Sequence, residues 1–279
     1  MSHPHAPVII TAAICGAEVF RAQTPFIPYT PAELAAEAIR CYHAGARMVH
    51  LHMREDDGTP SQDASRFLDT MQRIRAEVPM VVQFSTGGAV GMPVAVRADA
   101  LRHRPDMATL TTGTVNFGEE IFVNSLPMIR EIAARQREFG VRPEIEVFDS
   151  GMIDTAVRLG REGTIELPAH FDFVMGVPGG MGASPERLDF LISLLPPGAT
   201  WSVAGVGRHE LPLAQAAMAR GGHVRVGLED NLFLSKGVLA KGSYELVEAV
   251  RAMAETTGRP IATADQTRAL LRLAPIAAL

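Results

Sequence analysis

Two histidines separated by a single residue are the feature of this sequence that most directly suggests chemistry. His50 and His52 lie in the apolar run of residues 48–53, which predicts a short buried strand closed by the turn residues 56–58. Because side chains alternate faces along a strand, both imidazoles point the same way. Such a pair supplies part of a zinc site and needs a third ligand from elsewhere in the chain. Two hydrogen-bonded core histidines would give the same pattern.

Two carboxylates and an arginine near the end of the chain are candidates to complete such a site. Glu229 and Asp230 follow the apolar run of residues 223–227, which contains Arg225. Glu229 is the candidate third ligand, although an acid near a helix start is a common alternative. Asp230 is the candidate general base, with a pKa that we expect neighbouring cations to lower. Arg225 could hold Asp230 or a substrate carboxylate, or form a structural ion pair.

Polar residues and glycines at the ends of other predicted strands extend the candidate site. Ser85 begins the run Ser85-Thr86-Gly87-Gly88, in which Gly87 and Gly88 permit close backbone approach to a carboxylate, phosphate or thioester oxygen. No Gly-x-Ser-x-Gly motif surrounds Ser85, so we interpret it as a hydrogen-bond donor rather than a nucleophile. The remaining candidates at strand ends are Glu18, Thr109 and Glu146.

Several other residues that could do chemistry are expected to have structural roles. His43 and His209 are predicted to be surface or packing residues, and Trp201 is predicted to be a core or lining residue. Three arginines are interpreted as solvated charges: Arg40, Arg54 and Arg187.

The elements that must position these residues alternate along the chain. Apolar runs predict buried strands at residues 8–13, 48–53, 80–84, 107–110, 144–148, 171–175, 200–204 and 223–227. Capped or amphipathic segments predict helices at residues 31–44, 64–77, 94–102, 126–139, 152–162, 185–195, 211–220 and 244–256, the last closing the chain. This alternation, without a linker, predicts a single α/β domain over residues 1–279, a (β/α)8 TIM barrel of parallel strands.

A closed barrel explains how distant residues could meet. Its active site lies at the C-terminal ends of the strands, where the candidate residues fall. The strand at residues 223–227 would be two positions from the strand at 48–53, across the first strand. Glu229 could therefore reach a metal faced by His50 and His52, with a coordination position left open for water or substrate.

Composition excludes several classes of protein. The net charge of −5 argues against a nucleic-acid partner, which usually requires a basic surface. No apolar run approaches the roughly 18 residues that span a bilayer, so no membrane partner is expected. Cys15 and Cys41 cannot build a disulfide framework and suit a reducing compartment. The first residues lack signal-peptide features, and a cytoplasmic location is the expectation.

Five separated motifs resemble those of the β-keto acid cleavage enzymes, in particular members acting on 3-keto-5-aminohexanoate. They occupy residues 11–18, 49–58, 85–91, 176–181 and 227–231. The resemblance implies a zinc-dependent barrel that assembles as a homotetramer. It also implies a Claisen-type exchange in which 3-keto-5-aminohexanoate and acetyl-CoA give acetoacetate and 3-aminobutanoyl-CoA. Cys15 departs from the family pattern, because a hydroxyl residue such as threonine is expected at this position. The departure concerns the shape of the pocket and not the chemistry.

The resemblance also implies roles for individual residues. The implied zinc ligands are His50, His52 and Glu229, and Asp230 is the implied base, assisted by Arg225. Implied substrate contacts are Ser85, Thr109 and Glu18, with Glu146 in the acid motif of the fifth strand. A buried Glu18 would select a substrate with an amino group, because a buried carboxylate requires a cation.

The hypothetical reaction path begins when a carbanion from acetyl-CoA adds to the keto carbonyl. CoA transfer and a retro-Claisen step would then release acetoacetate. Alternatives are the same reaction on another β-keto acid such as dehydrocarnitine, and a zinc aldolase or hydrolase that uses no CoA. A metal-binding protein without catalysis is disfavoured by the number of polar groups at the barrel mouth.

Overall fold

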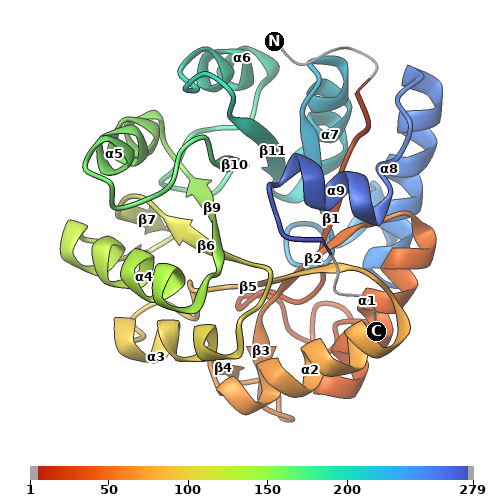
Figure 1. Ribbon diagram of the computed structural model, residues 1–279. Coiled ribbons are helices and arrows are strands. Elements are labelled where there is room, and N and C mark those ends of the chain that lie inside the picture. The colour runs from red at the N-terminus through yellow and green to blue at the C-terminus, as the bar shows by residue number, and fades with distance from the viewer. Residues whose placement is uncertain (1–5, 276–279) are drawn as a thin grey trace.

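The computed structural model describes residues 6–275 and shows a closed barrel of eight parallel strands (Figure 1). The strands are β1 (Ile10–Ala13), β2 (Met48–Leu51), β5 (Val81–Phe84), β6 (Met107–Thr111), β9 (Arg142–Val147), β10 (His170–Met175), β11 (Thr200–Gly205) and β12 (His223–Val226). They follow one another in chain order around the barrel, and β12 pairs with β1 to close it. The prediction of a single (β/α)8 barrel is confirmed for the described residues.

Helices surround the barrel on its outside, except for the last of them, which lies at one end of the barrel (Figure 1). They are α1 (Pro31–Ala44), α2 (Ala64–Glu77), α3 (Val94–Asp99), α4 (Leu126–Phe139), α5 (Ser150–Arg161), α6 (Pro185–Ser193), α7 (Glu210–Ala219), α8 (Ser243–Thr257) and α9 (Ala264–Leu270). The predicted capping box begins α1, since the Thr30 hydroxyl accepts from the Glu33 N–H at 3.2 Å and the Glu33 carboxylate accepts from the Thr30 N–H at 3.0 Å. None of the helices within residues 6–275 is long and apolar enough to cross a membrane.

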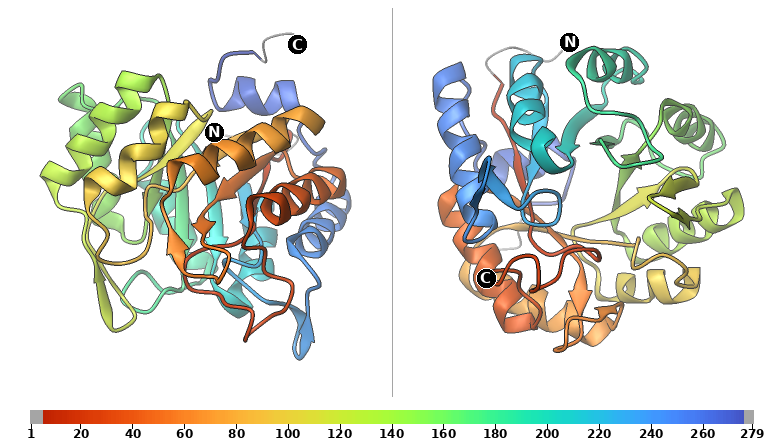
Figure 2. Two further views of the ribbon diagram at one scale, coloured as in Figure 1. Left: turned by 90° about the horizontal axis from the view of Figure 1, so that it is seen from below. Right: turned by 180° about the vertical axis from the view of Figure 1, so that it is seen from behind.

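The structure adds elements that the apolar pattern of the sequence does not predict. Three hairpins are formed by β3 (Met53–Arg54) with β4 (Pro60–Ser61), β7 (Val115–Phe117) with β8 (Glu120–Phe122), and β13 (Phe233–Ser235) with β14 (Val238–Leu239). The hairpins β7–β8 and β13–β14 project from the end of the barrel opposite α9 (Figure 2). The helix α9 follows α8, so the expectation that residues 244–256 form the last helix is wrong.

A small apolar cluster explains the position of α9. Ile9, Met48, Val81 and Met107, at or just before the starts of four neighbouring strands, are almost fully buried together with Leu271. Leu271 directly follows α9 and covers the amino-terminal end of the barrel. The helix therefore shields apolar side chains that would otherwise meet water.

Candidate metal centre and active site

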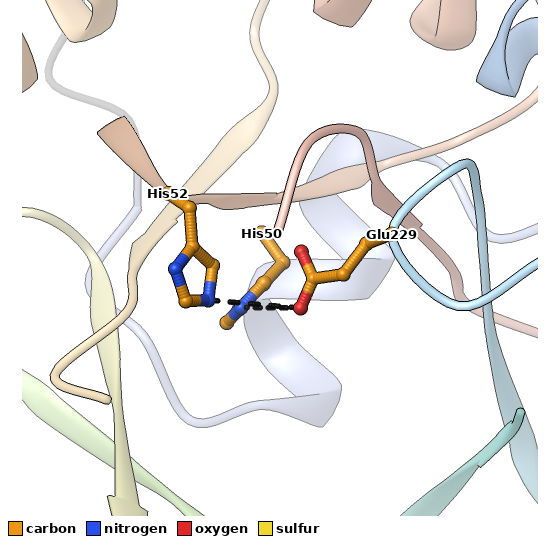
Figure 3. Close-up of side chains that lie close together, drawn as sticks. All are labelled: His50, His52 and Glu229. Atoms are coloured by element: carbon orange, nitrogen blue, oxygen red, sulfur yellow. Dashed lines mark ion pairs between the residues drawn. The ribbon is translucent and has the colours of Figure 1, made fainter. Parts of the chain in front are cut away.

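Three side chains predicted as metal ligands lie together at the C-terminal end of the barrel. His50 lies on β2 and His52 directly after it. Glu229 follows β12, and its Oε1 lies 3.5 Å from Nε2 of His50 and 3.6 Å from Nε2 of His52 (Figure 3). One potential ligand atom from each residue lies within 4.8 Å of the other two. This grouping could hold a metal ion.

The closure of the barrel accounts for this grouping. Strand β1 lies between β12 and β2, and its last residue, Ala13, pairs with His50. The Glu229 backbone N–H donates to the Ala13 carbonyl at 3.1 Å. The end of β1 therefore fixes the segment that carries Glu229 beside the strand that carries the histidine.

The protonation pattern of the cluster suits a divalent metal. The Nδ1–H of His50 donates to Oε1 of Gln83 at 2.6 Å, which leaves the Nε2 lone pair free to bind a cation. Burial lowers the pKa of His52 to about 3, so its ring is neutral. For His50, burial lowers the pKa, but the Glu229 carboxylate and the hydrogen bond to Gln83 together outweigh burial, and the net shift is upward. The cluster therefore attracts positive charge.

An oxygen without a partner is the clearest sign that a cation fits this site. Oε2 of Glu229 is buried and accepts no hydrogen bond from the described residues. A buried carboxylate oxygen left unpaired is costly unless a ligand satisfies it. Two imidazoles and one carboxylate form the donor set of catalytic zinc sites, in which a fourth position stays open. The side chains present thus fit a zinc ion.

Arg225 connects the metal cluster to the candidate base. Its Nε and Nη2 donate to the two carboxylate oxygens of Asp230 at 2.9 and 3.0 Å, and Nη2 also donates to Oε1 of Glu229 at 2.6 Å. Its Nη1 lies 3.5 Å from Asp172 and 3.8 Å from Glu146. A guanidinium fork of this kind fixes the orientation of a carboxylate. Arg225 thus holds Asp230 and also forms ion pairs with three other carboxylates at the barrel mouth, so two of its expected roles are seen together, and contact with a substrate carboxylate stays a prediction.

The pKa of Asp230 differs from the expectation. Burial raises the pKa of Asp230 to about 6, with Arg225 opposing the shift. Nearby cations were expected to lower it, but removal of the carboxylate from water outweighs them. A carboxylate with a raised pKa is a stronger base near neutral pH. For Glu229 burial would also raise the pKa, but Arg225, His50 and His52 lower it below its usual range.

These groups open into one cavity of about 400 Å³. Its polar lining comprises Glu18, His52, Ser85, Glu146, Arg225, Glu229 and Asp230, with the backbone of Gly87 and Gly88. Its apolar lining includes Phe117 and Phe122, which the hairpin β7–β8 supplies, and Phe148. The cavity can therefore hold a small polar molecule between a metal site and aromatic side chains.

Comparison with known proteins decides the family. A family model described as beta-keto acid cleavage enzyme matches residues 7–273. This chain belongs to the β-keto acid cleavage enzyme family. The resemblance of the five sequence motifs to that family is thus confirmed.

Members of the family with assigned names align along nearly the whole chain. The 3-keto-5-aminohexanoate cleavage enzyme of Fusobacterium nucleatum is 52% identical, with 95% of this chain and 98% of that protein covered. The enzyme of the same name from Acetoanaerobium sticklandii is 49% identical, with 95% of this chain and 97% of that protein covered. The 3-oxoadipate:acetyl-CoA acetyltransferase of Cupriavidus necator is 41% identical, with 96% and 95% covered.

Solved structures support the fold of this family member. The apo structure of ObcA aligns with a TM-score of 0.79 at 23% identity, over 91% of this chain and 66% of that chain. The ternary complex of ObcA with C4-CoA adduct and oxalate aligns with a TM-score of 0.77 at 24% identity, over 91% and 68%. This chain therefore spans about two thirds of the length of those structures, and the likeness shows the fold.

Two residues predicted to contact substrate are placed differently from the expectation. Thr109 does not line the cavity: its hydroxyl accepts from the Thr86 N–H at 3.0 Å, while the Thr86 hydroxyl donates to the Thr109 carbonyl at 2.8 Å. It supports the loop that carries Ser85. Glu18 lines the cavity but is exposed to solvent, whereas a buried carboxylate was expected.

The interpretation of Arg54 as a solvated charge is wrong. Its side chain is fully buried and donates to three backbone carbonyls. Its position beside a buried strand is the only signal in the sequence that could have indicated this. Arg40 and Arg187 are exposed and His43 lies on the surface, as predicted. Trp201 is buried and stacks on Phe173, with ring centroids 5.8 Å apart, which confirms a core role.

Proposed function

We propose that this family member converts 3-keto-5-aminohexanoate and acetyl-CoA to acetoacetate and 3-aminobutanoyl-CoA. The relatives named for 3-keto-5-aminohexanoate are 52% and 49% identical, compared with 41% for the relative named for 3-oxoadipate and 33% for the one named for 3-dehydrocarnitine. This ranking supports the choice of substrate. Acetyl-CoA as co-substrate is supported by the names of the latter two relatives.

The single observation that carries the proposal is the set of side chains that line one cavity. It brings together the carboxylate of Glu18, the candidate metal site at His52 and Glu229, and the Arg225–Asp230 pair. A substrate with a keto acid at one end and an ammonium group at the other matches this distribution of charge. Glu18 would then pair with the ammonium group.

The structures of the two products determine which carbon atom is the nucleophile. Acetoacetate carries an acetyl group on the carbon next to its carboxylate, so the acetyl carbonyl carbon must become bonded to C2 of the keto acid. The nucleophile is therefore C2 of the keto acid, which replaces the attack by acetyl-CoA expected from the sequence. Acetyl-CoA deuterated on its methyl group would retain all its deuterium in acetoacetate, whereas loss of deuterium would contradict this path.

The residues of the cavity can perform that sequence of steps. Asp230, oriented by Arg225, takes a proton from C2, and the C2 carbanion displaces CoA thiolate from acetyl-CoA. The thiolate adds to the keto carbon C3, and the C2–C3 bond breaks to give 3-aminobutanoyl-CoA and the acetoacetate carbanion. That carbanion recovers the proton from Asp230. A divalent metal held by His50, His52 and Glu229 would polarise the keto oxygen and acidify C2.

Zinc and a homotetramer are part of the proposal. Zinc is favoured because two imidazoles and a carboxylate are ligands typical of it. A homotetramer is supported by exposed apolar side chains at the hairpins, among them Ile121, Phe233 and Val238. Two buried free cysteines agree with a cytoplasmic location.

A panel of β-keto acids tests the proposed function. Acetoacetate formation is measured with 3-keto-5-aminohexanoate, 3-oxoadipate and dehydrocarnitine in the presence of acetyl-CoA, and consumption of each keto acid is measured with and without acetyl-CoA. We expect the highest kcat/KM with 3-keto-5-aminohexanoate and no turnover without acetyl-CoA. A preference for another acid would reassign the substrate, and turnover without acetyl-CoA would favour an aldolase or hydrolase.

A further inference from the structure

One buried arginine connects the segment that carries Glu18 to the rest of the barrel mouth. Arg54 lies on β3, and its side chain is 0% exposed. Its Nε donates to the Gly16 carbonyl at 2.9 Å, and its Nη2 donates to the Val19 carbonyl at 2.9 Å. Because Gly16 and Val19 lie on either side of Glu18 in the chain, the guanidinium holds the backbone on both sides of this carboxylate.

The position of this guanidinium depends on the loop of residues 14–30, which supplies most of its neighbours. Its Nη1 donates to the Gly58 carbonyl at 2.8 Å, and its Cζ lies 4.8 Å from the ring centroid of Phe20 and 5.7 Å from that of Tyr29. Among residues 6–275 no carboxylate forms an ion pair with Arg54. Carbonyl dipoles and ring faces are therefore what stabilise this buried charge.

The loop fixed in this way also packs against the candidate metal site. Residues 14–30 form no helix or strand, so external contacts determine their path. At Gly16, an added Cβ would lie only 2.6 Å from Cγ of Glu229. One guanidinium thus fixes both the backbone that touches a predicted metal ligand and the backbone that presents Glu18.

We infer that Arg54 is a positioning residue for substrate selection. By fixing the carbonyls of Gly16 and Val19, it holds the Glu18 carboxylate where the ammonium group of a substrate can meet it. Arg54 does not line the cavity and acts only through this backbone. The inference rests on the proposed function, because it requires a substrate with an amino group.

A conservative substitution and a matched pair of substrates test the inference. Arg54→Lys keeps the positive charge but replaces a planar fork, which reaches three carbonyls, by a single ammonium group. The substrates are 3-keto-5-aminohexanoate and 3-ketohexanoate, which differ only in the amino group. We expect the ratio of their kcat/KM values to fall about tenfold, through a higher KM for the amino substrate. The value for 3-ketohexanoate should change less than about threefold.

Arg259 provides a matched control at the other end of the barrel. It is 2% exposed, and its guanidinium donates to the carbonyls of Ala6, Met218 and Gly222 at 2.9, 3.0 and 2.7 Å. Arg259→Lys removes a comparable set of bonds without touching the loop of residues 14–30. We expect a lower melting temperature and an unchanged substrate ratio.

The remaining outcomes separate this inference from the proposed function. In Arg54→Lys, an unchanged ratio or an equal loss on both substrates would overturn the positioning role. If that variant does not fold, Tyr29→Phe loosens the same loop, because the Tyr29 hydroxyl accepts from the Arg21 N–H at 2.7 Å. A smaller fall in the ratio then supports the inference, and an unchanged ratio refutes it. A wild-type enzyme without preference for the amino substrate would instead refute the proposed function.

Discussion

His50 and Gln83 face each other on neighbouring strands, and Nδ1 of His50 lies 2.6 Å from Oε1 of Gln83. Because this bond is buried, it determines which ring nitrogen carries the proton. The other nitrogen, Nε2, is then the one available to a metal. Partners of this kind orient metal-binding histidines and increase their affinity.

Replacing Gln83 should weaken metal binding without removing a ligand. We expect Gln83→Leu to lower zinc affinity about 10- to 100-fold, since His50 loses the acceptor that fixes its tautomer. Titration against a zinc-binding dye measures this. Gln136→Leu is the control, because Gln136 is also buried but donates to the carbonyls of Ala108 and Thr109. Equal affinities in the two variants would contradict the role of Gln83.

Gly16 should tolerate no side chain beside Glu229. Its φ of 67° already disfavours other residues, and a Cβ would lie 2.6 Å from Cγ of Glu229. Gly140 has a φ of 68° with nothing within 4 Å of its Cβ position. Gly140→Ala should therefore lose only about 1–2 kcal/mol of unfolding free energy from backbone strain. Gly16→Ala should in addition lose zinc affinity at least about tenfold, and normal affinity would refute the predicted contact.

Asp230 should be needed for turnover and not for metal binding. We expect Asp230→Asn to lower kcat by about 10²- to 10⁴-fold, the usual range for a lost general base. Zinc content measured by atomic absorption should stay at the wild-type level, because the ligands are His50, His52 and Glu229. A variant that keeps wild-type kcat would remove Asp230 from the mechanism.

A buried histidine should make stability depend on pH. The Ile9 N–H donates to Nδ1 of His223 at 3.1 Å, and burial, with His170 and Arg259 nearby, lowers the pKa of His223 well below its usual value. Below about pH 6.5 the unfolded chain binds a proton that the folded protein does not, so stability is lost as pH falls.

The size of that effect can be measured against a variant. Between pH 7.5 and 5.5, the unfolding free energy of the wild type should fall about 1.4 kcal/mol more than that of His223→Asn. Urea unfolding at the two pH values gives both numbers. Other titrating groups, such as Glu144, are present in both proteins and cancel in the difference. Equal losses would show that the pKa of His223 does not change on folding, which would contradict the lowered pKa.

The barrel fold and the grouping of His50, His52 and Glu229 could be predicted from the sequence. Both depend on the local spacing of apolar residues and on the order of the strands. Residues 64–77 and 126–139 are helical as predicted, since their apolar spacing is regular. His50 and His52 share a face because of the strand period, and Glu229 reaches them because the closure places β1 between their strands. These relations require no knowledge of individual side-chain contacts.

Other features depended on contacts that the local sequence does not reveal. The hairpin strands of two or three residues are too short for a periodic pattern, so β7–β8 and its aromatic contribution to the cavity were not predicted. The burial of Arg54 depends on carbonyls of Gly16, Val19 and Gly58, which only the folded chain brings together. The raised pKa of Asp230 likewise reflects burial.

Removal of the metal is the most direct test of the account. The enzyme is dialysed against a chelator, assayed for acetoacetate from 3-keto-5-aminohexanoate and acetyl-CoA, and assayed again after stoichiometric zinc is added. We predict that turnover is lost with the metal and returns with zinc, and that His52→Ala does not recover it. Full turnover by the chelated, metal-free enzyme would contradict a catalytic metal held by His50, His52 and Glu229.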